Sequence, residues 1–180
     1  MASLRTLVAY VEDKPGVLNR VASLFRRRGY NIASLNVGRT HESGVSRMTI
    51  VVEGDSQVAQ LMEANLYKLV NVLSVDDITD TPSVVRDMAL VKVSVDMHQR
   101  AEVLQLVEVF HARVVDICPA TLIAEITGAP EKIDAFVDVL QPYGILEMVQ
   151  TGRISMTRGV EGEASRISHG QGTDSVVTAV

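Results

Sequence analysis

The order in which two hydrophobic periodicities alternate along the chain constrains its fold more than any other feature. Apolar residues at every second position predict a strand over residues 4–11. Apolar residues at helical spacing, among them Leu18, Val21 and Phe25, predict a helix directly after it. Two strands, a second helix and a closing strand follow, at 31–37, 46–53, 58–69 and 70–75. The first part of the chain therefore has the order strand, helix, strand, strand, helix, strand.

The same order occurs again after a polar segment. Residues 79–87, which Pro82 interrupts, are predicted to be a linker. Strands are then expected over 88–95, 114–118, 121–127 and 145–156, with helices over 100–110 and from Pro130 to the residues before Gly144. The halves share an order of elements rather than a residue pattern, so the repeat is one of architecture. Residues 160–180, rich in Gly, Ser and Thr, are predicted to be a disordered tail.

An open antiparallel sheet with both helices on one face suits this order. The sequence therefore predicts an α+β fold of two ferredoxin-like βαββαβ domains, the first over residues 4–78 and the second over 88–159. A unit of this size is marginally stable alone. Because its bare sheet face and its edge strands favour pairing with another copy, we expect a homodimer.

Composition argues against several classes of function. The chain has 180 residues with a formal net charge of −5, whereas non-specific nucleic-acid binding needs a basic surface. An RNA-recognition module shares this order of elements, but the strand at 46–53 lacks the aromatic residues on which bases stack. No apolar run is long enough to span a bilayer, so no membrane association is expected.

Residue types that carry catalysis are not grouped into any motif. The four histidines lack metal-ligand spacing, and no glycine-rich phosphate loop or nucleophile elbow is present. The single cysteine, Cys118, is expected to be a packed thiol rather than a nucleophile. One cysteine and a first strand that leaves no room for a signal peptide predict a cytoplasmic location. We therefore predict no catalytic residue, metal or cofactor in this chain.

The loop before the first helix contains Pro15 and Gly16. Pro15 is expected at the first helical position, where its missing N–H is not needed. Gly16 would let a ligand approach the backbone closely. The N–H groups of a first helical turn favour an anionic group, such as the carboxylate of a small ligand. An ordinary start of a helix is the alternative that these residues leave open.

Several segments carry a resemblance to a known family. A Pro-Gly helix start after a strand, in a small βαββαβ unit, resembles the ACT domain, a module that binds amino acids at dimer interfaces. A more specific resemblance is to the small regulatory subunit of acetolactate synthase (acetohydroxyacid synthase). The segments that carry it are PGVLNRVASLFRRRGYNIASLNV, SRMTIVV and KLVNVLSV, followed by MALVKV, VVDI and KIDAFVDVL. The resemblance covers about residues 4–159.

The resemblance implies a subunit that does no chemistry itself. It would activate a large catalytic subunit that holds thiamine diphosphate, Mg²⁺ and FAD, and would make it sensitive to valine or a related branched-chain amino acid. The effector would meet the backbone of Gly16, Val17 and Leu18 of one protomer and, from the facing protomer, Asn31 and Ile32. The first domain would also form the homodimer.

One position departs from the family, in which many members carry Asn before the Pro-Gly step. Asp13 stands there, and its carboxylate would pair with the effector's ammonium, repel its carboxylate or only cap the helix. The alternative function is that of a free-standing ACT protein that senses amino acids and regulates another enzyme or a transcription factor.

Overall fold

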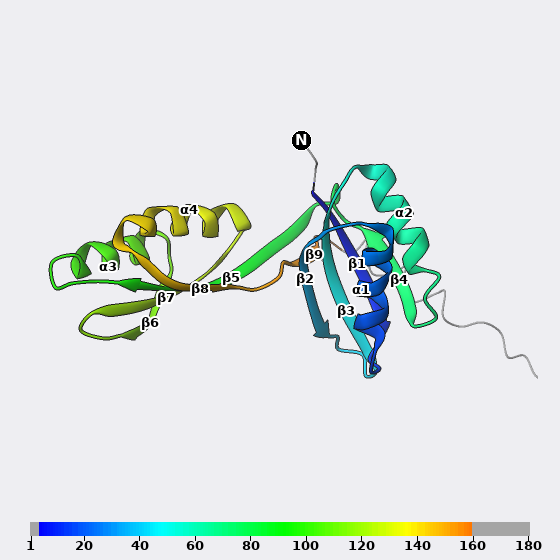
Figure 1. The fold of residues 1–180 in the computed structure, drawn as a ribbon, viewed down its shortest axis with the longest axis horizontal. Coiled ribbons are helices and arrows are strands. Elements are labelled where there is room, and N and C mark those ends of the chain that lie inside the picture. Colours follow the sequence, from blue (N-terminus) through cyan, green and yellow to red (C-terminus); the bar gives the residue numbers. More distant parts are fainter. Residues whose placement is uncertain (1–3, 160–180) are drawn as a thin grey trace, which may run out of the picture. The chain divides into compact units, whose positions relative to one another are not determined.

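The computed structural model describes residues 4–159, which form two compact units, each with its own antiparallel sheet (Figure 1). This is the α+β class that the sequence predicts, in two ferredoxin-like arrangements. The tail predicted over 160–180 lies outside the described residues. None of the helices within residues 4–159 is long and apolar enough to cross a membrane.

The first unit has four strands and two helices. In chain order they are β1 (Leu4–Glu12), α1 (Val17–Arg28), β2 (Ile32–Arg39), β3 (Val45–Glu53), α2 (Ser56–Leu66) and β4 (Val72–Asp77). The strand order in the sheet is β2-β3-β1-β4, so that β1 pairs antiparallel with both β3 and β4. The two helices contact each other, and α2 also contacts β1 and β4.

Strand β1 is buried on both of its faces. Leu7 and Ala9 on one face and Val8 on the other have no exposed surface. The sequence predicts this, because the strand carries apolar residues on both faces. The helix α1 contributes Val21 and Phe25 to the core, as predicted, whereas Leu18, predicted in the same apolar stripe, is exposed.

The second unit repeats the arrangement. Its elements are β5 (Ser83–Ser94), α3 (Arg100–Val109), β6 (Arg113–Ile117), β7 (Thr121–Gly128), α4 (Pro130–Leu140), the 3₁₀ turn η1 (Gln141–Tyr143), β8 (Ile145–Gln150) and β9 (Ile154–Thr157). The strand order is β6-β7-β5-β8, and β9 also pairs with β5. A hydrophobic core joins one face of β5 and β7 to α3 and α4, with Val91, Leu122 and Phe136 fully buried in it.

The structure corrects several predicted boundaries. Helix α2 ends at Leu66 and β4 begins at Val72, whereas the sequence predicts a helix to residue 69 and a strand from residue 70. Strand β5 begins at Ser83, inside the segment 79–87 predicted as a linker, because Val84 and Val85 favour extended backbone and Asp87 pairs with Gly128. Pro82 precedes the strand, where its missing N–H removes no ladder hydrogen bond. The strand predicted over 145–156 is divided into β8 and β9, with Gly152 in the break between them.

Cys118 is exposed, which corrects the prediction of a packed thiol. It lies in the turn that follows β6, where its N–H donates to the carbonyl of Thr121 at 2.8 Å. A turn at the end of a hairpin has no second layer to cover it, and its apolar neighbours in the sequence therefore do not bury the thiol.

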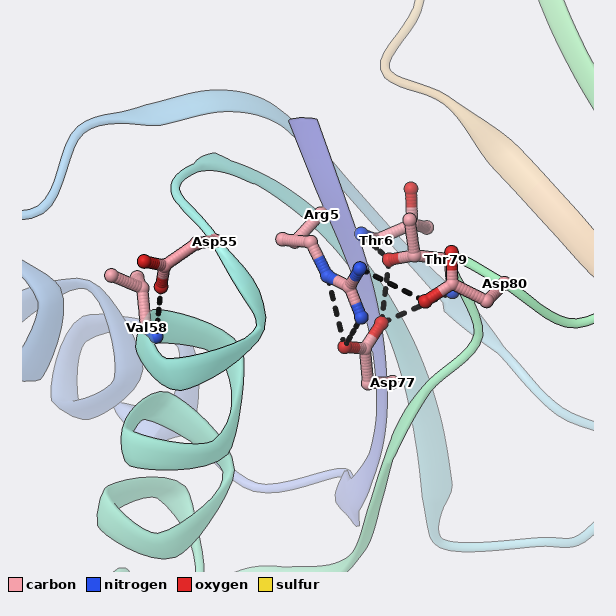
Figure 2. Close-up of polar contacts among 7 residues, drawn as sticks. All are labelled: Arg5, Thr6, Asp55, Val58, Asp77, Thr79 and Asp80. Atoms are coloured by element: carbon pink, nitrogen blue, oxygen red, sulfur yellow. Dashed lines mark hydrogen bonds and ion pairs between the residues drawn. The ribbon is translucent and has the colours of Figure 1, made fainter. Parts of the chain in front are cut away.

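A polar cluster fastens the start of β1 to the end of β4 (Figure 2). Arg5 donates from Nε and Nη2 to Oδ2 of Asp77, at 3.1 and 2.5 Å, and from Nη1 to Asp80 at 3.0 Å. Thr79 donates to Asp77 and accepts the N–H of Thr6. Burial alone would raise the pKa of Asp77, but the hydrogen bonds from Thr79 and Arg5 outweigh it and lower that pKa.

Replacing Asp77 tests this cluster. We expect Asp77→Asn to lower the free energy of unfolding by roughly 1–3 kcal/mol, because it removes the carboxylate to which a largely buried guanidinium donates. Since the pKa of Asp77 is lowered by folding, its contribution is present above the unfolded-state pKa and is lost as pH falls through the folded-state pKa. Urea unfolding should therefore show that the difference in the free energy of unfolding between the wild type and Asp77→Asn becomes smaller at acidic pH.

The matched control is Asp80→Asn. The Asp80 side chain is 81 % exposed and accepts from the same guanidinium, so its loss should change stability by less than about 0.5 kcal/mol. An Asp77→Asn protein as stable as the wild type at neutral pH would contradict the role assigned to this ion pair.

Candidate functional site

The backbone turns sharply between β1 and α1. The carbonyl of Lys14 accepts the N–H of Val17 at 3.3 Å, and Gly16 has φ of 84° and ψ of −6°. These features define a type II turn with proline second and glycine third. Gly16 is therefore required for a conformation that other residues rarely adopt. Helix α1 begins at Val17, so the prediction that Pro15 is the first helical residue is wrong: the turn needs Pro15 before the helix.

The first turn of α1 offers two N–H groups. Those of Leu18 and Asn19 have no hydrogen-bond partner within the described part of the chain, whereas those of Val17 and Arg20 donate to Lys14 and Gly16. Nothing lies within 4 Å of where a Cβ of Gly16 would be, and Gly16 itself is exposed. The first turn carries no acidic residue. An anion can therefore reach these N–H groups from solvent, at the positive end of the helix dipole.

The predicted site residues near the start of α1 differ in how far their side chains are exposed to a ligand. Val17 is 4 % exposed and packs in the core, so its side chain is not available to a ligand. Leu18 is 44 % exposed beside the turn. Asp13 is exposed, and its carboxylate lies 3.7 Å from Nε of Arg39. No side chain caps α1, which excludes helix capping from the three roles left open for Asp13.

Asn31 and Ile32 lie at the other end of α1. Asn31 is exposed directly before β2, and its side chain makes no hydrogen bond within residues 4–159. Ile32 is the first residue of β2 and is half-buried. The twelve residues of α1 separate them from Gly16 by about 18 Å. The structure therefore does not bring Asn31 and Gly16 together within one chain, and a site that includes both needs a second copy.

Sequence reasoning missed a polar network beside the first turn of α1. Asn71, which is 9 % exposed, accepts a hydrogen bond from Nη1 of Arg20 at 2.5 Å and donates to the carboxylate of Glu12. Lys14 also donates to that carboxylate, at 3.1 Å. The hydrogen bonds from Asn71 and Lys14 lower the pKa of Glu12. Only the pairing of β1 with β4 brings these residues together, and no local pattern signals it.

Across residues 4–159, no three His, Cys, Asp or Glu side chains come close enough together to hold an ion. The exposed N–H groups and the glycine at the start of α1 are suited to binding a small anion.

Two family models match the chain. The model described as an AHAS small subunit-like ACT domain matches residues 7–74, in the first unit. The model described as the small subunit of acetolactate synthase matches residues 86–159. The two matches follow one another in the order of the two structural units.

Individual proteins are similar to this chain over most of its length and of their own. The chain is 46 % identical, over 86 % of its residues and 96 % of the relative, to the probable acetolactate synthase small subunit of Archaeoglobus fulgidus. It is also 46 % identical to the acetolactate synthase small subunit of Mycolicibacterium smegmatis, over 87 % of this chain and 92 % of that one. The crystal structure of the small subunit from Thermotoga maritima matches with a TM-score of 0.82 and 38 % identity, over 88 % and 99 % of the two chains.

Removing the amide of Asn71 tests the network at this end of α1. We expect Asn71→Ala to raise the pKa of Glu12 toward its ordinary value, because the hydrogen bond from Asn71 is the main cause that lowers it. Lys14→Gln should raise the same pKa less. Titration of the side-chain carboxyl signals by NMR measures both shifts, and an unchanged Glu12 in Asn71→Ala would contradict the network.

Proposed function

The chain belongs to the family of acetolactate synthase small subunits, and from that premise we propose that it activates the large catalytic subunit and confers feedback inhibition by valine or a related branched-chain amino acid. The observation that carries this proposal is 46 % identity over nearly the full length of proteins named as that subunit. Thiamine diphosphate, Mg²⁺ and FAD would then be held by the large subunit. This chain would bind the effector.

The start of α1 is the proposed place of the effector's carboxylate. The N–H groups of Leu18 and Asn19 would donate to it, and the helix dipole would favour its negative charge. Gly16 leaves the approach open because it has no side chain there. The type II turn supports the proposal, because it leaves the N–H groups of Leu18 and Asn19 without a partner in the chain.

The effector's other groups would meet a second copy of the chain. Asn31 of the partner protomer has an amide oxygen that can accept from an ammonium group, and Ile32 is an apolar neighbour for a branched side chain. Because these residues lie at the far end of α1 in their own chain, each effector would contact both protomers. A homodimer through the first unit is part of the proposal for that reason.

Reconstitution tests the function directly. We expect the purified chain alone to form no acetolactate, to raise the rate of its large subunit when the two are mixed, and to make that rate fall when valine is added. A free-standing amino-acid sensor would bind valine but leave the large subunit unchanged. Acetolactate formation by this chain in a preparation shown to lack the large subunit would contradict the proposal.

Substitutions at Gly16 locate the effector. Gly16→Asp and Gly16→Asn share the strain of a positive φ, which Asp and Asn tolerate better than most residues, and only Gly16→Asp adds a negative charge. Losing one charge-assisted hydrogen bond costs about 1.5–3 kcal/mol, or roughly ten- to a hundred-fold in affinity. We expect Gly16→Asp to weaken valine binding by at least this factor, and Gly16→Asn by less, with activation retained.

Asn31→Ala should weaken valine binding more mildly, from across the dimer. Calorimetry measures the affinities, and circular dichroism checks that each variant is folded. If Gly16→Asp and Asn31→Ala both fold and bind valine as the wild type does, the effector site lies elsewhere. If these variants still activate the large subunit, that result contradicts only the location of the effector site and not the proposed function as a whole.

A further inference from the structure

The first unit contains a cavity away from the start of α1. It is open to solvent, lies between the C-terminal end of α1 and the end of α2 with the turn that follows it, and has a volume of about 440 Å³. The residues that line it are Leu24, Arg27, Arg28, Asn65, Lys68 and Leu69. The volume lies within the range of roughly 300–1,000 Å³ that small-molecule sites have. Every charged residue among those that line it is a cation, and all three, Arg27, Arg28 and Lys68, are exposed at its rim.

A buried amide holds two of these cations in place. Asn65 is 2 % exposed, and its Oδ1 accepts from Nη2 of Arg28 at 3.0 Å and from Nζ of Lys68 at 3.1 Å. Its Nδ2 donates to the carbonyl of Leu61 at 2.7 Å, which fixes the direction of the amide. Arg28 and Lys68, from different segments, are therefore held within about 6 Å of each other, where like charges repel.

No carboxylate offsets this repulsion. Within residues 4–159, none of Arg27, Arg28 and Lys68 forms an ion pair with a carboxylate. Cations at the end of a helix ordinarily complement its dipole. That role does not require Arg28 and Lys68 to converge on one buried oxygen beside a cavity. Leu24, which is 7 % exposed, and Leu69 supply an apolar wall.

We propose that this cavity binds the phosphoryl group of a small molecule between Arg28 and Lys68. A phosphoryl group carries about 1.5 to 2 negative charges at neutral pH, which suits several converging cations better than a single carboxylate does. The planar guanidinium of Arg28 can donate two parallel hydrogen bonds to phosphate oxygens. The rest of the ligand would lie against Leu24 and Leu69.

The cavity is separate from the proposed effector site. Gly16 precedes the first turn of α1, whereas Arg27 and Arg28 occupy its last turn. A phosphoryl group in the cavity and an amino acid at the helix start would therefore bind at the same time. Competition between them would mean that the anion occupies the start of the helix instead.

Calorimetry on the full chain tests the site, with inorganic phosphate and phenyl phosphate as probes at matched ionic strength. The tighter-binding probe shows whether free phosphate or a phosphate ester is the ligand. We expect Arg28→Gln and Lys68→Gln each to weaken binding by about ten-fold or more, the loss that one charge-assisted hydrogen bond produces. Arg26→Gln is the matched control, because Arg26 lies in the same last turn and does not line the cavity.

Three results would overturn the proposal. The first is the absence of binding by either probe at millimolar concentration. The second is an equal loss in Arg26→Gln and Arg28→Gln, which would indicate general attraction to the end of the helix. The third is displacement of the probe by saturating valine. Circular dichroism of each variant ensures that a loss of binding is not a loss of fold.

Discussion

The pairing of β1 with both β3 and β4 is the constraint on which the first unit depends. Its register runs from Leu4 opposite Glu53 to Glu12 opposite Val45 on one side, and places Val11 opposite Val72 on the other. This register brings the end of β1 to Asn71 and its start to Asp77. The chain leaves the sheet at Glu12, enters the type II turn at Pro15 and Gly16, and returns along α1. The start of that helix is therefore positioned by the sheet.

Helix α1 presents different chemistry at its two ends, because of its dipole. At its start, unpaired N–H groups attract an anion without any charged side chain in the first turn. At its end, the dipole opposes an anion, so an anion site there depends on cationic side chains. Arg28 and Lys68 supply them, and Asn65 sets their positions. The proposed effector carboxylate and the proposed phosphoryl group would thus be held on one helix by two different physical means.

The order of elements was predictable from sequence because hydrophobic periodicity is local. Asp55 illustrates this: Asp is a residue type that favours the position before a helix, and its side chain here accepts the N–H of Val58 at the start of α2 (Figure 2). The position of Pro15 was missed because the turn type depends on φ at Gly16, which composition does not give. The network of Glu12, Arg20 and Asn71 and the cavity beside Asn65 depend on contacts between distant segments, so no pattern in either segment predicts them.

In the proposed arrangement, an effector held between two protomers would explain how so small a ligand moves a large equilibrium. Shifting a two-state equilibrium from 1:99 to 99:1 requires about 5.5 kcal/mol of difference in binding free energy between the states. One charge-assisted hydrogen bond at Leu18 or Asn19 supplies roughly 1.5–3 kcal/mol, which is too little by itself. A twofold dimer would contain two equivalent sites, each with contacts from both chains. Because Gly16 and Asn31 lie about 18 Å apart in one chain, these contacts form together only when the protomers are correctly placed. The separation of the two half-sites is therefore what would make effector binding depend on the arrangement of the dimer.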